Sequence, residues 1–416
     1  MQNNDLDTIS TGAQGVARRA EDQRLRVVIS GGGTGGQIYP ALAVARELRQ
    51  RYQAQILYIG DSDGLEKRLV PEAGFQLETI HAGRLLRYWS MQTIRNLARV
   101  PIGFVEARRV MREFAPHATF TSGGYVAVPV GYAARRLGVP LLIHQQDVSP
   151  NLANRLLRRM ATRISTSFED SAKYFPRAKT QVMGNPVRDI VIAQAGSDLR
   201  VHKRELNFSP AFPLLVVTGG SQGARHINEA VVEALPTLLE RFQILHISGQ
   251  LTYDETRTAA TPQVGGLPEH VAARYHLVPY LNDEMAIALA AADAVIARAG
   301  AATLAELAIL GKPSLLVPLP LGFGGSPQEA NAAMFAQHGA AQVVLDQDLN
   351  GETLRAAVQD LFANPETRRR MGIAARGLAR PQAATDLAST VVSLGQIYIE
   401  ERRKRMVEEA IRKASK

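Results

Sequence analysis

The feature that most constrains the fold is a pattern of apolar strand, glycine-rich turn and helix that occurs twice. The first copy runs from the apolar segment LRVVIS through the glycines at 31–36 into IYPALAVARELRQRY. The second runs from PLLVVT through the turn at 219–223 into a second amphipathic segment. Short apolar runs that alternate with helical periodicity indicate β-α-β units and a parallel sheet. The duplication predicts an α/β fold of two similar, doubly wound, Rossmann-like domains.

Length and composition agree with this division. A chain of 416 residues exceeds one core and fits two domains of about 150–200 residues. We expect a disordered polar leader at 1–23, domains at 24–187 and 188–382, a helix at 383–400 and a basic tail at 401–416. The absence of cysteine excludes disulfides and thiol nucleophiles.

Glycine turns that lead into helices are candidate anion sites, because free backbone N–H groups and the helix dipole both favour phosphate. The net charge of +9 also points to acidic partners. Residues 83–112 contain seven arginines and one glutamate, interleaved with apolar and aromatic side chains. No nucleic-acid motif accompanies them, so we expect no nucleic acid as a partner. The stretch suits either an anionic lipid surface, or core residues on one helix face and solvated arginines on the other.

Polar residues at two later helix starts suggest a sugar site. Thr303 and Glu306 fall in the first turns of a helix that is otherwise apolar. A carboxylate there either stabilises the helix dipole or accepts two hydroxyl groups of a ribose. Gln328, Glu329 and Asn331 stand together at the next helix start, which suits sugar hydroxyls.

Several long motifs occur in a fixed order and carry a resemblance. They read GGGTGGQIYPALAVA, SGGYVAVPVGYAARRLGVPLLIHQQ, MGNPVR, GGSQGARHIN, ARAGAATLAELAILGKPSLLVPLP and QEANA. Together they resemble the MurG family of bacterial N-acetylglucosaminyltransferases over residues 24–398. The resemblance implies a GT-B fold and inverting transfer of GlcNAc from UDP-GlcNAc to the 4-hydroxyl of a lipid-linked MurNAc-pentapeptide, lipid I, which gives lipid II.

The same resemblance implies the site residues. Arg188 would approach the uridine diphosphate, Leu281 the uracil and Glu306 the ribose. The full donor set is Thr34, Gly35, Gly36, Arg188, Ser221, Gln222, Gly223, Leu281, Thr303, Glu306, Gln328 and Glu329. The acceptor and membrane set is Gly33, Tyr125, Asp147, Arg87, Trp89 and Arg95.

Two positions depart from the family pattern. Gln37 stands where the family has a histidine, which is a candidate general base. A neutral amide cannot take up the acceptor proton at pH 7. Asp147 ends HQQD where the family usually reads HEQN, with asparagine last. One hypothesis makes Asp147 the base, oriented by Gln37; the other leaves Gln37 as a hydrogen-bonding residue and assigns the rate to positioning and leaving-group stabilisation.

The resemblance also implies where the enzyme works. We expect a peripheral protein at the cytoplasmic face of the cell membrane, with cell-wall assembly proteins as further partners. We expect no cofactor and no metal, because Asp61 with Asp63 and Asp346 with Asp348 both lie away from the predicted donor site. The alternatives are a related GT-B enzyme that glycosylates diacylglycerol and a catalytically silent homologue that binds sugar nucleotides.

Overall fold

The computed structural model describes residues 24–33, 35–82, 91–320 and 328–415, with the backbone alone for 91–100. The chain forms two compact units. Unit 1 comprises Met1–His144, Leu152–Ile164 and Ala384–Lys416, and unit 2 comprises Gln145–Asn151 and Ser165–Ala383. Each unit is described by itself.

The sheet of the N-terminal half has seven strands in the order β3-β2-β1-β4-β5-β6-β7. Its strands are β1 (Arg26–Ser30), β2 (Gln55–Asp61), β3 (Gln76–Ile80), β4 (Ala118–Thr121), β5 (Leu141–Gln145), β6 (Arg163–Thr166) and β7 (Thr180–Val182). The pairs from β3 to β5 are parallel. The order reverses direction between β1 and β4, and doubly wound sheets bind ligands at such a point.

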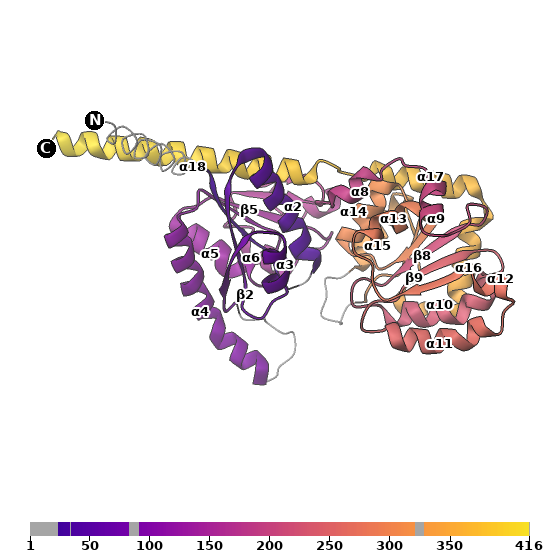
Figure 1. The fold of residues 1–416 in the computed structure, drawn as a ribbon. Coiled ribbons are helices and arrows are strands. Elements are labelled where there is room, and N and C mark those ends of the chain that lie inside the picture. Colours follow the sequence, from indigo (N-terminus) through magenta and orange to yellow (C-terminus); the bar gives the residue numbers. More distant parts are fainter. Residues whose placement is uncertain (1–23, 34, 83–90, 321–327, 416) are drawn as a thin grey trace, which may run out of the picture. The chain divides into compact units, whose positions relative to one another are not determined.

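Helices cover this sheet. They are α2 (Gly35–Tyr52), α3 (Glu66–Glu72), α4 (Met91–Phe114), α5 (Ala127–Leu137), α6 (Leu152–Leu157) and α18 (Ala383–Ala414). Helix α4 lies beside α5, where Phe104 and Tyr132 meet edge to face (Figure 1). No helix in the described part of the chain is both long and apolar enough to cross a membrane.

Unit 2 repeats the arrangement with six parallel strands in the order β10-β9-β8-β11-β12-β13. The strands are β8 (Leu214–Thr218), β9 (Gln243–Ile247), β10 (Tyr275–Val278), β11 (Ala294–Ala297), β12 (Ser314–Leu316) and β13 (Gln342–Val343). Both sheets begin with the order of a Rossmann sheet, so the predicted pair of doubly wound domains is confirmed.

The helices of unit 2 form two layers. They are α7 (Glu169–Ala172), α8 (Asp189–Ala193), α9 (Leu199–Glu205), α10 (Arg225–Leu238), α11 (Tyr253–Gly265), α12 (Glu269–Ala272), α13 (Glu284–Ala291), α14 (Ala301–Leu310), α15 (Glu329–Gln337), α16 (Gly351–Ala363) and α17 (Pro365–Gly377). Successive side chains of strand β8 point alternately toward these two layers. Leu214 and Val216 belong to the core with α13 and α14, whereas Leu215 and Val217 belong to the core with α10 and α16 (Figure 1).

The compact units divide between Ile164 and Ser165, and Phe168 and Val187 are both buried in a core cluster with residues of unit 2. The first sheet nevertheless continues through β6 and β7 to Val182. The boundary at 187 and 188 therefore stays a prediction.

The last helix is continuous through the basic tail. Its first part is buried in unit 1 at Leu387, Ala388 and Val391. Gly395 packs against Leu25, where a Cβ atom would lie 3.6 Å from the side chain of Ala118. Residues 399–415 are all exposed, so the helix continues beyond the core that it covers.

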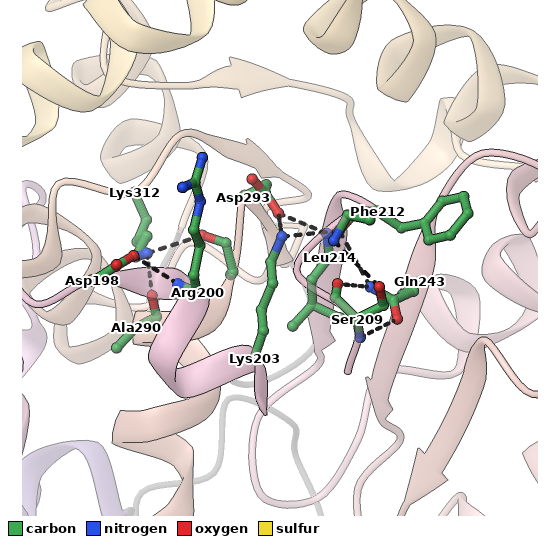
Figure 2. A network of polar contacts seen from close by, with 12 residues as sticks. Asp198, Arg200, Lys203, Ser209, Phe212, Leu214, Gln243, Ala290, Asp293 and Lys312 are labelled. Atoms are coloured by element: carbon green, nitrogen blue, oxygen red, sulfur yellow. Dashed lines mark hydrogen bonds and ion pairs between the residues drawn. The ribbon is translucent and has the colours of Figure 1, made fainter. Parts of the chain in front are cut away.

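Two buried lysines lie near the amino ends of β8, β11 and β12 in unit 2 (Figure 2). Lys203 Nζ lies 2.6 Å from Asp293 Oδ2 and donates to the carbonyl of Phe212. Lys312 Nζ donates to the carbonyls of Ala290 and Ala292 at the end of α13, at 2.6 and 2.9 Å. Both ammonium groups satisfy polar groups that would otherwise be buried without partners.

Lys312 is expected to make the stability of the protein depend on pH. Burial lowers its pKa from 10.5 to about 8. The unfolded chain therefore binds one more proton than the folded chain between these values, and the free energy of unfolding rises with pH across that window. Relative to Lys312→Met, the wild type should gain up to about 3 kcal/mol between pH 7 and pH 11, measured by urea unfolding. A difference that stays constant with pH would contradict this assignment.

Candidate active site

The first glycine turn follows β1 and interlocks with a second loop after β4. Gly33 has φ +98° and Gly124 has φ +87°, which L side chains rarely adopt. A Cβ atom on Gly124 would lie 2.6 Å from Gln37 Oε1. Ser122 Oγ donates to the Gln37 carbonyl at 2.6 Å. The two loops therefore enclose Gln37 in unit 1.

Three polar side chains lie beneath this turn. Tyr58 Oη donates to the Gly31 carbonyl at 2.5 Å. Glu66 is fully buried, and neither carboxyl oxygen has a hydrogen-bond partner of ordinary geometry among the described residues. Burial, and then the charge of Asp61, raises the pKa of Glu66, and nearby backbone N–H groups offset only part of that rise.

Tyr125 joins the second loop to this buried group. A Cβ atom on Gly33 would lie 2.9 Å from Tyr125 Cε1, so the ring packs against the first turn. Its Oη donates to Asp61 Oδ2 at 3.1 Å. Asp61, at the end of β2, is 9% exposed and also accepts from the backbone N–H of Ala82 at 3.3 Å. The half-buried phenol covers the carboxylate.

The second glycine turn lies in unit 2, between β8 and α10. Ser221 and Gln222 are exposed at its tip, and Gly223 donates from its backbone to Gly220 at 3.0 Å. Gly249 packs on Gly223 so closely that a Cβ atom would collide with its backbone. The exposed tip and the following helix N-terminus have the form of an anion site.

Arg188 and Glu306 form an ion pair in unit 2. Glu306 lies on α14, just after β11, with its side chain 17% exposed. Arg188 Nε and Nη2 each lie 3.3 Å from Glu306 Oε1, and Nη1 donates to the Asn282 carbonyl at 3.2 Å. Burial raises the pKa of Glu306, and the guanidinium of Arg188 opposes that rise.

The remaining predicted donor residues lie on the same unit. Leu281 packs against the core beside the Asn282 carbonyl that holds Arg188, and Thr303 is half-buried on α14. Gln328 Oε1 accepts from the backbone N–H of Leu319 at 3.1 Å, and Glu329 begins α15. These side chains follow β10, β11 and β12, at the end of the sheet where the glycine turn follows β8.

Asp147 also belongs to unit 2. Its Oδ1 accepts from Asn331 Nδ2 at 2.8 Å. Asn331 is fully buried, donates to the Ala299 carbonyl at 2.9 Å and accepts from the Val148 N–H at 2.8 Å. Asn331 therefore ties the short segment 145–151 to α15.

The predicted residues divide between the units. Gly33, Gly35, Gly36, Gln37 and Tyr125 lie together in unit 1, and the other described residues of the site lie in unit 2. Thr34, Arg87 and Trp89 and the side chain of Arg95 lie outside the described residues.

Sequence reasoning missed two polar groups. One is Glu66, whose position inside a short polar helix gave no sign of burial. The other is Arg298, which follows β11 and pairs with Asp346, whose Oδ2 lies 2.8 Å from His226 Nδ1. His226 is in the first turn of α10, so Asp346 reaches closer to the second glycine turn than its sequence position suggested. Each Asp346 oxygen thus has one of these side chains as a partner.

Family models agree with both halves of the fold. The glycosyltransferase family 28 N-terminal domain matches residues 27–166, and the family 28 C-terminal domain matches residues 214–389. Curated relatives carry the name UDP-N-acetylglucosamine--N-acetylmuramyl-(pentapeptide) pyrophosphoryl-undecaprenol N-acetylglucosamine transferase. The protein from Caldanaerobacter subterraneus subsp. tengcongensis is 39% identical over 89% of this chain and 100% of its own length. That from Desulforamulus reducens is 40% identical over 88% of this chain and 98% of its own.

Solved structures have the same architecture. MurG of Acinetobacter baumannii matches with a TM-score of 0.71 and 29% identity over 89% of this chain and 99% of that chain. The UDP-GlcNAc 2-epimerase of Neisseria meningitidis, solved with UDP-GlcNAc, matches with a TM-score of 0.62 and 14% identity over 89% of this chain and 100% of that chain. The second likeness concerns the fold alone.

Proposed function

The chain belongs to glycosyltransferase family 28, and from this we propose that it transfers GlcNAc from UDP-GlcNAc to lipid-linked MurNAc-pentapeptide. The observation that carries the proposal is the near-complete match to relatives that bear the name of this activity. The product is lipid II, so the enzyme acts in peptidoglycan synthesis and thereby in cell-wall biogenesis, cell shape and cell division. In enzyme terms it is a hexosyltransferase.

The reaction is a direct displacement with inversion. The acceptor 4-hydroxyl oxygen forms a bond to the anomeric carbon, the bond from that carbon to the diphosphate breaks, and UDP leaves with the electron pair. The hydroxyl proton passes to a base. The second glycine turn supplies backbone N–H groups for the diphosphate, and Arg188 supplies positive charge where the leaving group gains negative charge.

Arg188 and Glu306 exchange partners when the donor binds. Arg188 Nη2 and Glu306 Oε1 lie 3.3 Å apart, so each neutralises the other. In the complex, Arg188 turns to the diphosphate and the Glu306 carboxylate accepts the two ribose hydroxyls. The exchange keeps both buried charges partnered before and after binding, which avoids the cost of leaving either one alone.

A surface of unit 1 supports peripheral attachment to the cytoplasmic face of the membrane. Ile102 and Val105 on α4 are 50% and 71% exposed, and Leu152 and Leu156 on α6 are 60% and 51% exposed. Arg108, Arg109 and Arg112 are exposed on α4. Apolar side chains among cations fit an anionic lipid surface. Cell-wall assembly proteins are further proposed partners.

The first experiment measures GlcNAc transfer from UDP-GlcNAc to a lipid I analogue by the wild type and by Gln37→His. We expect turnover by the wild type. UDP-GlcNAc binding without turnover, with activity gained in Gln37→His, would instead identify a silent homologue. Transfer to diacylglycerol and not to the lipid I analogue would favour the related diacylglycerol enzyme.

The base proposed from the sequence is Asp147. If it takes the proton, Asp147→Asn should lower kcat by about 100-fold, within the usual range for a general base. UDP-GlcNAc binding should be retained, because an amide oxygen can still accept the hydrogen bond from Asn331. Retention of most of the turnover would remove Asp147 from this role.

A further inference from the structure

We infer that Tyr125 and Asp61 form a proton relay that takes the acceptor hydroxyl proton in place of the missing histidine. This inference rests on the proposed function, and it assigns the base of that reaction to unit 1. It concerns two side chains from separate segments, Tyr125 before α5 and Asp61 at the end of β2.

The first support is position. The Tyr125 ring packs on Gly33, and Gln37 Oε1 lies against Gly124, the residue before Tyr125. Gln37 occupies the place of the family histidine. The Tyr125 phenol and the Gln37 amide therefore border the same junction of two glycine loops, where an imidazole would otherwise stand.

The second support is the direction of the hydrogen bond. Tyr125 Oη donates to Asp61 Oδ2 at 3.1 Å. A phenol that donates its proton to a carboxylate can accept another proton on the same oxygen. Asp61 is 9% exposed, so a substrate hydroxyl reaches it through the half-buried phenol. Asp61 is held in place by the backbone N–H of Ala82 at 3.3 Å.

The third support is the buried carboxyl beside Asp61. Glu66 of α3 is fully buried with no ordinary hydrogen-bond partner among the described residues, and its pKa is raised, first by burial and then by Asp61. Tyr58 of β2 lies beneath the same turn, and burial raises its pKa well above its usual value. Asp61 is the carboxylate of this group that accepts hydrogen bonds from Tyr125 Oη and from the backbone N–H of Ala82.

The step balances in protons and electrons. The acceptor oxygen bonds to the anomeric carbon while UDP leaves with the electron pair of the broken bond. The hydroxyl proton passes to Tyr125 Oη, and the phenol proton passes to Asp61 Oδ2. After product release, Asp61 returns a proton through Tyr125 to water. Tyrosine ends each turnover unchanged.

The relay differs from the Asp147 hypothesis in where it lies. Asp147 belongs to unit 2, and one of its oxygens is held by Asn331. Asp61 and Tyr125 belong to unit 1 with Gln37. The relay thus uses residues that meet at the altered position itself.

The test compares Asp61→Asn, Tyr125→Phe and the double variant in the lipid I transfer assay. Each single variant should lower kcat by about 100-fold, and the double variant should lose little more, because groups that act as one unit are not additive. The KM for UDP-GlcNAc and the melting temperature should stay near wild type. Asp63→Asn is the matched control, since Asp63 is exposed two residues further along and should keep full activity.

Two further readouts separate a relay from a structural role. The pH profile of kcat should differ between the wild type and Asp61→Asn. Gln37→His should restore activity to Asp61→Asn by supplying an imidazole at the same junction. Wild-type kcat in Asp61→Asn, or a loss confined to KM, would overturn the relay while leaving the transferase intact. A wild type with no turnover would overturn the proposed function itself.

Discussion

Arg188→Ala is expected to lower kcat by about 10³-fold, the largest effect that we predict. A positioned cation is worth most where the leaving group gains charge, and loss of one such donor costs about 10²–10³ in kcat. Arg188 also neutralises Glu306 at 3.3 Å in the free protein. Its removal leaves that carboxyl buried without a cation, which raises the Glu306 pKa further and weakens the ribose contact as well.

The measurement is steady-state transfer to the lipid I analogue, with UDP binding measured separately. Arg188→Lys should recover part of the rate, because it restores the charge without the planar fork. Arg241→Ala is the matched control, because Arg241 is exposed between α10 and β9, near the amino end of β9. A loss in Arg188→Ala below tenfold would show that Arg188 does not act on the leaving group.

Glu306→Ala is expected to lower kcat/KM for UDP-GlcNAc by several hundred-fold. A carboxylate that accepts two ribose hydroxyls makes two charge-assisted hydrogen bonds, each worth about 1.5–3 kcal/mol. The raised pKa adds a pH effect. Only the ionised carboxylate accepts both hydroxyls. On acidification, donor affinity should therefore begin to fall at a higher pH than it would with an ordinary glutamate.

A ribose-modified donor makes this experiment specific. The wild type should discriminate strongly against 2′-deoxy-UDP-GlcNAc, and Glu306→Ala should treat the two donors almost alike. This double cycle isolates the pairwise contact from any general loss of structure. Equal discrimination by wild type and variant would show that Glu306 does not contact the ribose and only closes the ion pair with Arg188.

The sequence predicted the two sheets because their signals are local. The runs at 25–30 and 214–218 each precede a glycine turn and a helix, and both became the first strand of a doubly wound sheet. The extent of each compact unit has a non-local cause. Phe168 packs on Phe335 in unit 2, and no window of sequence contains both residues.

The candidate site divides in the same way. Arg188 and Glu306 were found through motifs, and their ion pair agrees with a shared location. The hydrogen bond from Tyr125 to Asp61 joins residues of different segments, so the sequence of neither segment predicts it. Burial of Glu66 depends on the close approach of Gly32 and Gly64, which leave no room for a side chain.

The return of α18 to unit 1 sets an order of assembly during synthesis on the ribosome. Strand β1 emerges early, yet Leu387, Ala388 and Val391, which are buried in the same unit, emerge near the end. Unit 2 is almost entirely one continuous segment, Ser165–Ala383, so most of it is available to fold while the first unit still lacks its final helix. The part of the protein that is made first is therefore the part that is finished last, and a nascent chain carries an open apolar face at Leu25 until translation is nearly complete.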